Sequence, residues 1–191
     1  MSFYNFAKKT LSLFMNAFFR IEVTGKHNFT DNKLIICSNH ISLLDPILVG
    51  IISPRKIYFM AKKELFKNKI LNKIITKLGA FPVDRRKGDI SAIKKSLKVL
   101  NEGNVLGIFL EGTRVKSENI ENAKPGVAMI AIKSKCNVLP IYIDANYKLF
   151  SKVKVIIGEP ISFEEFYDQK LNIDDYKKIS QNILKRIYAL K

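Results

Sequence analysis

The stretch CSNHISLLDP, residues 37–46, joins an expected strand to an expected helix and organises the rest of the chain. Residues 34–37 are apolar, which is typical of a short buried strand. Asp45 followed by Pro46 is typical of a helix N-cap and first helical position. His40 lies five positions before Asp45, and five residues of regular helix turn through about 500°. The two side chains can therefore meet only if an irregular turn separates them.

His40 and Asp45 are suited to base catalysis if that turn brings them together. A histidine titrates near neutral pH and can accept a proton. A neighbouring carboxylate can fix its tautomer and stabilise the imidazolium. The alternative is that Asp45 only caps its helix and His40 is an ordinary loop histidine.

Strands and helices alternate along the 191 residues. Strands are expected at 20–23, 34–37, 56–60, 80–83, 105–110, 138–143 and 152–157. Helices are expected at 46–52, 64–78, 126–135, between Asp89 and Gly103, and from 174 or 175 to 190. This order predicts a single α/β domain with a mostly parallel central β-sheet flanked by helices.

Residues 1–20 have the apolar periodicity of an amphipathic helix. Lys8, Lys9 and Asn16 interrupt it, whereas a bilayer span needs roughly 20 mostly apolar residues. The helix either covers the core or lies in a membrane interface with its phenylalanines at the acyl boundary. We assign residues 1–20 to a membrane-interface helix and residues 21–191 to the catalytic domain, with core cover as the alternative.

The formal net charge of +16 implies an anionic partner, which can be nucleic acid, a phospholipid surface, an acidic protein or an acidic substrate. Residues 55–98 alone hold 14 basic and three acidic residues. No nucleic-acid-binding motif and no tryptophan are present, so nucleic acid is not expected. Cys37 and Cys136 lack metal-ligand spacing, so we expect no metal, and such sparse cysteine usage is typical of a reducing cytosol.

Three polar turns, 38–45, 84–86 and 111–114, follow expected buried strands. Ligands of open α/β sheets bind outside the carboxyl ends of strands, so we expect these turns to converge on one site. Two of the turns carry arginine, whose guanidinium matches phosphate geometry. The combination indicates base catalysis beside a phosphate.

These turns resemble the sequence blocks of the glycerolipid acyltransferases. Residues 39–45 resemble the N-H-x-S-x-x-D block, 81–85 the second block, 109–114 the F-P-E-G-T-R block and 138–141 the apolar fourth block, with Lys-Pro-Gly at 124–126. Leu110 stands where the family usually has proline. The chain is most similar to the bacterial 1-acyl-sn-glycerol-3-phosphate acyltransferases, so residues 21–191 are expected to be an acyltransferase domain.

The resemblance implies acyl transfer from a thioester, either acyl-CoA or acyl-carrier protein, to the sn-2 hydroxyl of 1-acyl-glycerol-3-phosphate. The product is phosphatidic acid, and no cofactor is needed beyond the thioester co-substrate. His40 would act as general base, oriented by Asp45. Cys37 is a rival nucleophile, although a cysteine within an apolar strand is more often inert packing.

The resemblance also implies which residues bind the acceptor: Arg85, Glu111, Gly112, Thr113, Arg114 and Lys124. Arg85 and Arg114 would hold the phosphate. Glu111, an acid, would hydrogen-bond a glycerol hydroxyl or position an arginine. Gly112 would allow close backbone approach.

The expected partners are a phospholipid surface, lysophosphatidic acid, and acyl-CoA or an acidic acyl-carrier protein. The expected location is peripheral, on the cytoplasmic face of the cell membrane. One alternative keeps the chemistry but uses another acceptor, such as glycerol-3-phosphate or an amino-acid lysolipid. Another is a catalytically dead, basic membrane-binding module.

Overall fold

The computed structural model describes residues 2–84, 89–115 and 117–191. Within them, one seven-stranded sheet has the order β1-β7-β6-β2-β5-β3-β4. The strands are β1 (Arg20–Thr24), β2 (Leu34–Ser38), β3 (Ile57–Lys62), β4 (Phe81–Val83), β5 (Val105–Phe109), β6 (Val138–Ala145) and β7 (Lys152–Ile157).

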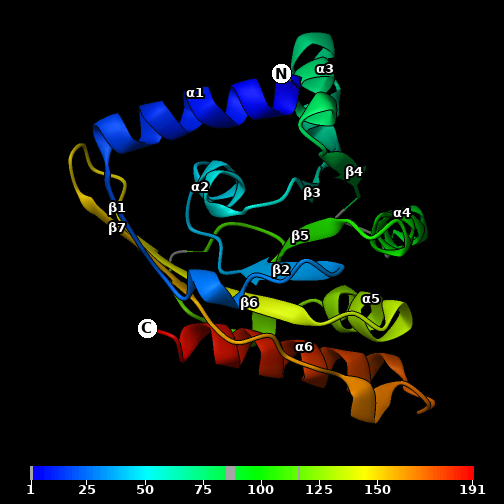
Figure 1. The fold of residues 1–191 in the computed structure, drawn as a ribbon. Coiled ribbons are helices and arrows are strands. Elements are labelled where there is room, and N and C mark those ends of the chain that lie inside the picture. The colour runs from blue at the N-terminus through cyan, green and yellow to red at the C-terminus, as the bar shows by residue number, and fades with distance from the viewer. Residues whose placement is uncertain (1, 85–88, 116) are drawn as a thin grey trace.

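Helices cover both faces of the sheet (Figure 1). On one face, α1 (Phe3–Phe18) lies over α2 (Asp45–Ile52), and both contribute to a core with the sheet. On the other face lie α4 (Ile90–Asn101), α5 (Gly126–Ser134) and α6 (Ile173–Tyr188). The short α3 (Lys69–Lys77) lies beyond β4, beside the start of α1.

The sheet is parallel except for the pairing of β6 with β7. This confirms the predicted α/β fold with its mostly parallel sheet. Because β2 to β6 all run in one direction, their carboxyl ends share one edge of the sheet. The connection from β6 to β7 lies at the same edge, as does the junction between α1 and β1. The turns after β2 and β5 are therefore neighbours, since these two strands pair directly.

The central strands β2 and β5 are buried along their whole length, as expected for strands covered on both faces. Gly107 in β5 allows an aromatic ring to cross the strand. A Cβ atom at this position would lie 2.4 Å from the Phe59 ring, which comes from the neighbouring β3. The absence of a side chain at Gly107 thus permits Phe59 to lie flat beside the carboxyl end of β5.

The single helix expected at 64–78 is wrong: the structure has a short 3-10 helix, Lys63–Phe66, followed by α3. Asn68 separates them because its side chain accepts hydrogen bonds from the main-chain N–H groups of Ile70 and Leu71, which starts a new helix. The apolar face of α3 also points outward, with Ile70 74% and Ile74 42% exposed.

The amphipathic helix expected within residues 1–20 is present as α1, although only Met15 on it is buried. Its outer face exposes apolar side chains, including Phe6 at 61%, Leu13 at 75% and Phe14 at 51%. Across the parts of the chain that the structure describes, no helix has the length and apolar character needed to cross a membrane.

Candidate active site

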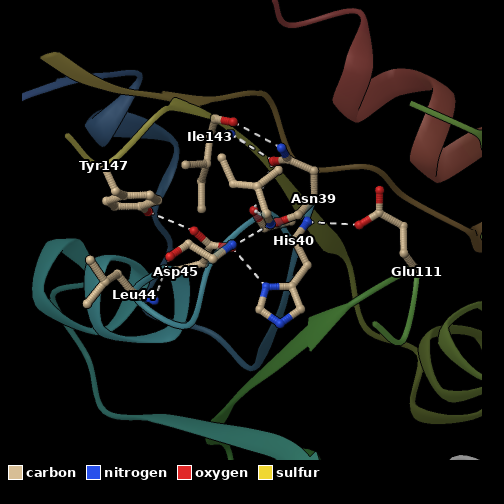
Figure 2. Close-up of polar contacts among 10 residues, drawn as sticks. Asn39, His40, Leu44, Asp45, Glu111, Ile143 and Tyr147 are labelled. Carbon is tan, nitrogen blue, oxygen red and sulfur yellow. Dashed lines mark hydrogen bonds and ion pairs between the residues drawn. The ribbon is translucent and has the colours of Figure 1, made fainter. Parts of the chain in front are cut away.

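The predicted irregular turn lies between Ser38, the last residue of β2, and Asp45, the first residue of α2. It brings the two side chains together: His40 Nδ1 lies 2.8 Å from Asp45 Oδ2 (Figure 2). The His40 side chain is largely buried and that of Asp45 completely so. The close approach that the spacing alone could not establish is therefore present.

The expectation that Asp45 caps α2 is wrong. The residue at the N-cap position is Leu44, and Asp45 is already helical. Asp45 Oδ2 turns back into the preceding loop and accepts from the main-chain N–H groups of Ile41 and Ser42, each at 2.7 Å. The carboxylate thus accepts from donors of the turn between β2 and α2 instead of donors of the helix, and these bonds hold the turn around His40.

The contacts of Asp45 determine which nitrogen of His40 carries the proton. Asp45 Oδ2 already accepts two main-chain hydrogen bonds, so the contact with His40 needs Nδ1 as the donor. Nε2 then keeps its lone pair. Among the residues described, none forms a hydrogen bond to Nε2, so this atom is available to take a proton from a substrate.

Aromatic packing fixes the plane of the imidazole. The His40 ring stacks on Phe109, the last residue of β5, with 4.2 Å between centroids and 22° between planes. Phe59 continues the stack at 6.0 Å from Phe109. The row of rings runs from the turn after β2 across β5 to β3, so the imidazole has an apolar floor, and its Nδ1 edge faces Asp45.

Glu111 follows β5 and is buried against the backbone of His40. Its Oε2 accepts from the His40 N–H at 2.8 Å, and its Oε1 accepts from the Tyr188 hydroxyl at the end of α6 (Figure 2 shows the first contact). The Val115 N–H donates to the His40 carbonyl at 2.9 Å, so the segment after β5 holds the main chain of His40 from both sides. Burial raises the pKa of Glu111, while the two donors oppose that rise.

The last residues of the block at 109–114 follow Glu111 in the segment after β5. Gly112 has φ +65°, a left-handed conformation that favours glycine. A Cβ added there would lie 3.7 Å from Lys124 Cγ, which places Lys124 beside the turn. Thr113, Arg114 and Lys124 are exposed. Arg114, expected to bind phosphate, thus lies on the segment that holds His40, and Lys124, expected to bind the acceptor, lies beside that segment.

The expected convergence of three turns holds for the turns after β2 and β5, which are in contact. β4 lies three strand spacings from β2, or about 14 Å at the usual separation of paired strands. Asp84, directly after β4, forms an ion pair with Lys63. Arg85 lies outside the described residues.

Two tyrosines at the site were not indicated by the sequence. Tyr147, between β6 and β7, donates to Asp45 Oδ1 at 2.7 Å, across 102 residues of chain. Tyr188 reaches Glu111 across 77 residues. Asn39 exchanges hydrogen bonds with the main chain of Ile143 in β6, at 3.0 and 2.8 Å. No local sequence pattern marks these long-range contacts.

Cys37, the rival nucleophile, is buried within β2. Burial raises the pKa of its thiol well above the ordinary value, and Cys136 adds to the rise. A thiol that stays protonated is a poor nucleophile. The structure thus favours His40 over Cys37 as the reactive group.

A cavity of about 440 Å³ borders the loop, and its walls include Asn39 and Glu111 but neither His40 nor Asp45. Its walls also carry Asp144 and Glu118, and one lysine, Lys191, which pairs with Glu118. Like charges repel, so this cavity is poorly suited to a phosphorylated acceptor. The cavity therefore gives no reason to prefer it over Nε2 of His40, to which no described residue forms a hydrogen bond.

Comparison with known proteins gives a consistent family. The acyltransferase family model matches residues 20–144. The 1-acyl-sn-glycerol-3-phosphate acyltransferase of Bacillus subtilis is 36% identical over 170 residues, covering 85% of this chain and 84% of that protein. The protein of the same name from Streptococcus pneumoniae is 30% identical over 167 residues, covering 84% of this chain and 61% of that protein.

A solved structure agrees with these sequence matches. The crystal structure of the 1-acyl-sn-glycerophosphate (LPA) acyltransferase PlsC from Thermotoga maritima is 25% identical, with a TM-score of 0.73, covering 97% of this chain and 80% of that one. The matched region 20–144 includes the His40–Asp45 pair, Glu111 and the segment after β5. The chain therefore belongs to the acyltransferase family.

Proposed function

We propose that this acyltransferase moves an acyl group from a thioester donor to the sn-2 hydroxyl of 1-acyl-glycerol-3-phosphate, forming phosphatidic acid. The observation that carries the proposal is the His40–Asp45 contact of 2.8 Å, in a loop whose main chain is held by the arginine-bearing segment after β5. Among the described residues, none forms a hydrogen bond to Nε2 of His40. The names of the relatives support this acceptor, and the basic, exposed turn at Thr113 and Arg114 suits its phosphate.

In the proposed reaction the acceptor hydroxyl approaches His40 Nε2. His40 removes the proton as the hydroxyl oxygen attacks the thioester carbonyl, and Asp45 stabilises the imidazolium through Nδ1. The carbon–sulfur bond then breaks, and the leaving thiolate takes the proton from His40. The products are the acylated acceptor and a free thiol, and no acyl-enzyme forms because the acceptor itself is the nucleophile.

The acceptor phosphate is proposed to bind the cations on the turn after β5. Arg114 can offer two parallel N–H donors to phosphate, and Lys124 adds a point charge beside Gly112. Arg85 is proposed as a second phosphate-binding arginine, and this rests only on the resemblance of residues 81–85 to the second sequence block. Glu111 is reassigned: with both oxygens accepting from His40 and Tyr188, it supports the loop that carries the base.

The protein is further proposed to work on the cytoplasmic face of the membrane, with acyl-CoA or an acidic acyl-carrier protein as donor and no separate cofactor. Supporting this, α1 and α3 expose neighbouring apolar faces, and Lys77 of α3 lies 5.4 Å from the ring of Phe3 in α1. Residues 65–83 hold four lysines and no acidic residue. Apolar side chains flanked by lysines suit an anionic bilayer surface.

Free-thiol release tests the reaction and the acceptor together. The protein is incubated with acyl-CoA or acyl-carrier protein and, separately, with lysophosphatidic acid, glycerol-3-phosphate or an amino-acid lysolipid. We expect thiol release that depends on lysophosphatidic acid. Release with another acceptor alone would replace the proposed substrate, and vesicle binding without any thiol release would favour the dead module.

Vesicle sedimentation tests the membrane surface. We expect binding to vesicles containing phosphatidylglycerol to weaken in a Leu13→Ser/Phe14→Ser double variant, since both side chains are exposed on α1. Ile173→Ser is the matched control, because Ile173 is 57% exposed on α6, on the opposite side of the sheet (Figure 1). Equal vesicle binding by the double variant and the control would contradict the proposal that the exposed apolar face of α1 binds the membrane.

A further inference from the structure

Tyr147 makes the fourth hydrogen bond to the Asp45 carboxylate. Asp45 Oδ2 takes His40 Nδ1–H and two main-chain N–H groups, whereas Asp45 Oδ1 accepts from the Tyr147 hydroxyl at 2.7 Å. Asp45 is completely buried, so water does not replace a missing donor easily. With both oxygens engaged, the carboxylate cannot rotate away from His40 without losing hydrogen bonds.

The hydroxyl of Tyr147 stays a donor over the working pH range. Burial raises the pKa of Tyr147, and the nearby charge of Asp45 and the hydrogen bond to it raise the pKa further. A phenol that remains protonated beside a carboxylate donates its hydrogen to that carboxylate. Tyr147 is therefore always the donor in this hydrogen bond, and Asp45 Oδ1 is always the acceptor.

The backbone of Tyr147 has φ +51°, in the left-handed region that bulky residues disfavour. Such conformations persist where surrounding contacts enforce them, and they gather at functional sites. The enforcing contacts are visible: the Tyr147 ring packs edge-on against Phe19, with 5.6 Å between centroids and 88° between planes. The Phe150 N–H also donates to the Phe18 carbonyl at 2.7 Å, which joins this loop to the end of α1.

We infer that Tyr147 is a positioning residue for the proposed acyl transfer: its hydroxyl holds Asp45 Oδ1, which keeps Asp45 Oδ2 on the Nδ1 proton of His40. The inference deepens the proposed function and rests on it. Tyr147 contacts Asp45, whereas Glu111, from the segment that carries Arg114, contacts the other side of the loop (Figure 2), so Tyr147 acts on the base and not on acceptor binding. Loss of the Tyr147 hydroxyl should therefore lower kcat and leave KM for the acceptor nearly unchanged.

Tyr147→Phe isolates the hydroxyl, because phenylalanine keeps the ring against Phe19 and removes only the donor. Tyr142→Phe is the control, since the Tyr142 hydroxyl bonds Glu118 and does not touch Asp45. Tyr147→Asn is a second variant, because asparagine tolerates a left-handed backbone better than other non-glycine residues but does not reproduce the phenol. All variants are assayed as the full chain by thiol release with lysophosphatidic acid.

We expect kcat to fall about 10-fold in Tyr147→Phe, a barrier change of about 1.4 kcal/mol. KM for lysophosphatidic acid should stay within about twofold, Tyr147→Asn should also be slow, and Tyr142→Phe should match the wild type. Wild-type kcat in Tyr147→Phe would overturn the inference. An equal fall in the Tyr142→Phe control would also overturn it.

Imidazole nitrogen NMR gives a second readout that does not depend on turnover. The chain has two histidines, so His27 serves as an internal reference for His40. We expect the His40 nitrogen shifts to move between wild type and Tyr147→Phe while those of His27 stay unchanged. Unchanged His40 shifts would refute the positioning role, whereas a wild-type protein that releases no thiol would refute only the proposed function.

Discussion

Replacing Glu111 by alanine is expected to destabilise the protein and slow the reaction through the backbone of His40. The substitution leaves the buried His40 N–H without its acceptor at 2.8 Å and also removes the acceptor of the Tyr188 hydroxyl. A buried donor left without a partner costs about 1–3 kcal/mol. Taking about 2 kcal/mol, the midpoint of thermal unfolding should fall by about 4–8 °C for a chain of this size.

Glu111→Gln is the matched control, because an amide oxygen can accept from His40 while the amide nitrogen donates to the Tyr188 oxygen. It also removes a carboxyl group whose pKa is raised by burial. A raised carboxyl pKa means that ionisation opposes folding, so the wild-type protein should lose stability relative to Glu111→Gln as pH rises through that pKa. Thermal unfolding at several pH values measures this difference.

Two results would refute this account of Glu111. One is an alanine variant that unfolds within about 0.5 kcal/mol of wild type, because the buried hydrogen bonds would then contribute little. The other is a glutamine variant with wild-type stability but a raised KM for the acceptor, since that pattern belongs to direct contact with the substrate.

Three further predictions concern the acceptor, the sheet and a helix cap. Arg114→Ala should raise KM for lysophosphatidic acid more than KM for the thioester, and equal effects on both in steady-state kinetics would give Arg114 a structural role. Gly107→Ala should destabilise the protein by about 1–3 kcal/mol in denaturant unfolding, because its Cβ would lie 2.4 Å from the Phe59 ring, and an unchanged midpoint would contradict that packing. Asp89→Ala should cost about 1 kcal/mol at neutral pH through loss of the α4 cap. Main-chain and Ser91 hydrogen bonds lower the pKa of Asp89 to about 2. The contribution of Asp89 to stability is therefore present above the ordinary pKa of 3.8 and is lost as pH falls through 2. A stability difference between wild type and Asp89→Ala that grows on acidification would refute this.

Local patterns were enough to predict the class of fold, and they indicated that His40 and Asp45 could meet only across an irregular turn. Alternating apolar runs and helical periodicities indicate a mostly parallel sheet, and the structure has one. His40 and Asp45 are five residues apart, so an irregular turn was required for contact and could be inferred without knowing the rest of the fold. Strand order was not predictable, because it depends on which strands pair in three dimensions.

The contacts that hold the pair in place depend on distant parts of the chain. Tyr147 and Tyr188 reach the site across 102 and 77 residues, so no spacing pattern marks them. The sequence blocks place Glu111 in the turn after β5, next to the His40 turn, but they do not indicate that its carboxylate accepts from the backbone of His40. The cap expected at Asp45 failed for a related reason: loop donors compete for its carboxylate, and the structure favours the loop.

The measurement that tests the central claim most directly is thiol release by His40→Ala, with Cys37→Ala as the matched control three residues away in the chain. Both variants are compared with wild type at saturating thioester and lysophosphatidic acid, after thermal unfolding confirms that each is folded. If His40 is the general base, its replacement should lower the rate by about 10²–10⁴-fold or more, and Cys37→Ala should remain active. A folded His40→Ala protein that keeps its activity would contradict the account.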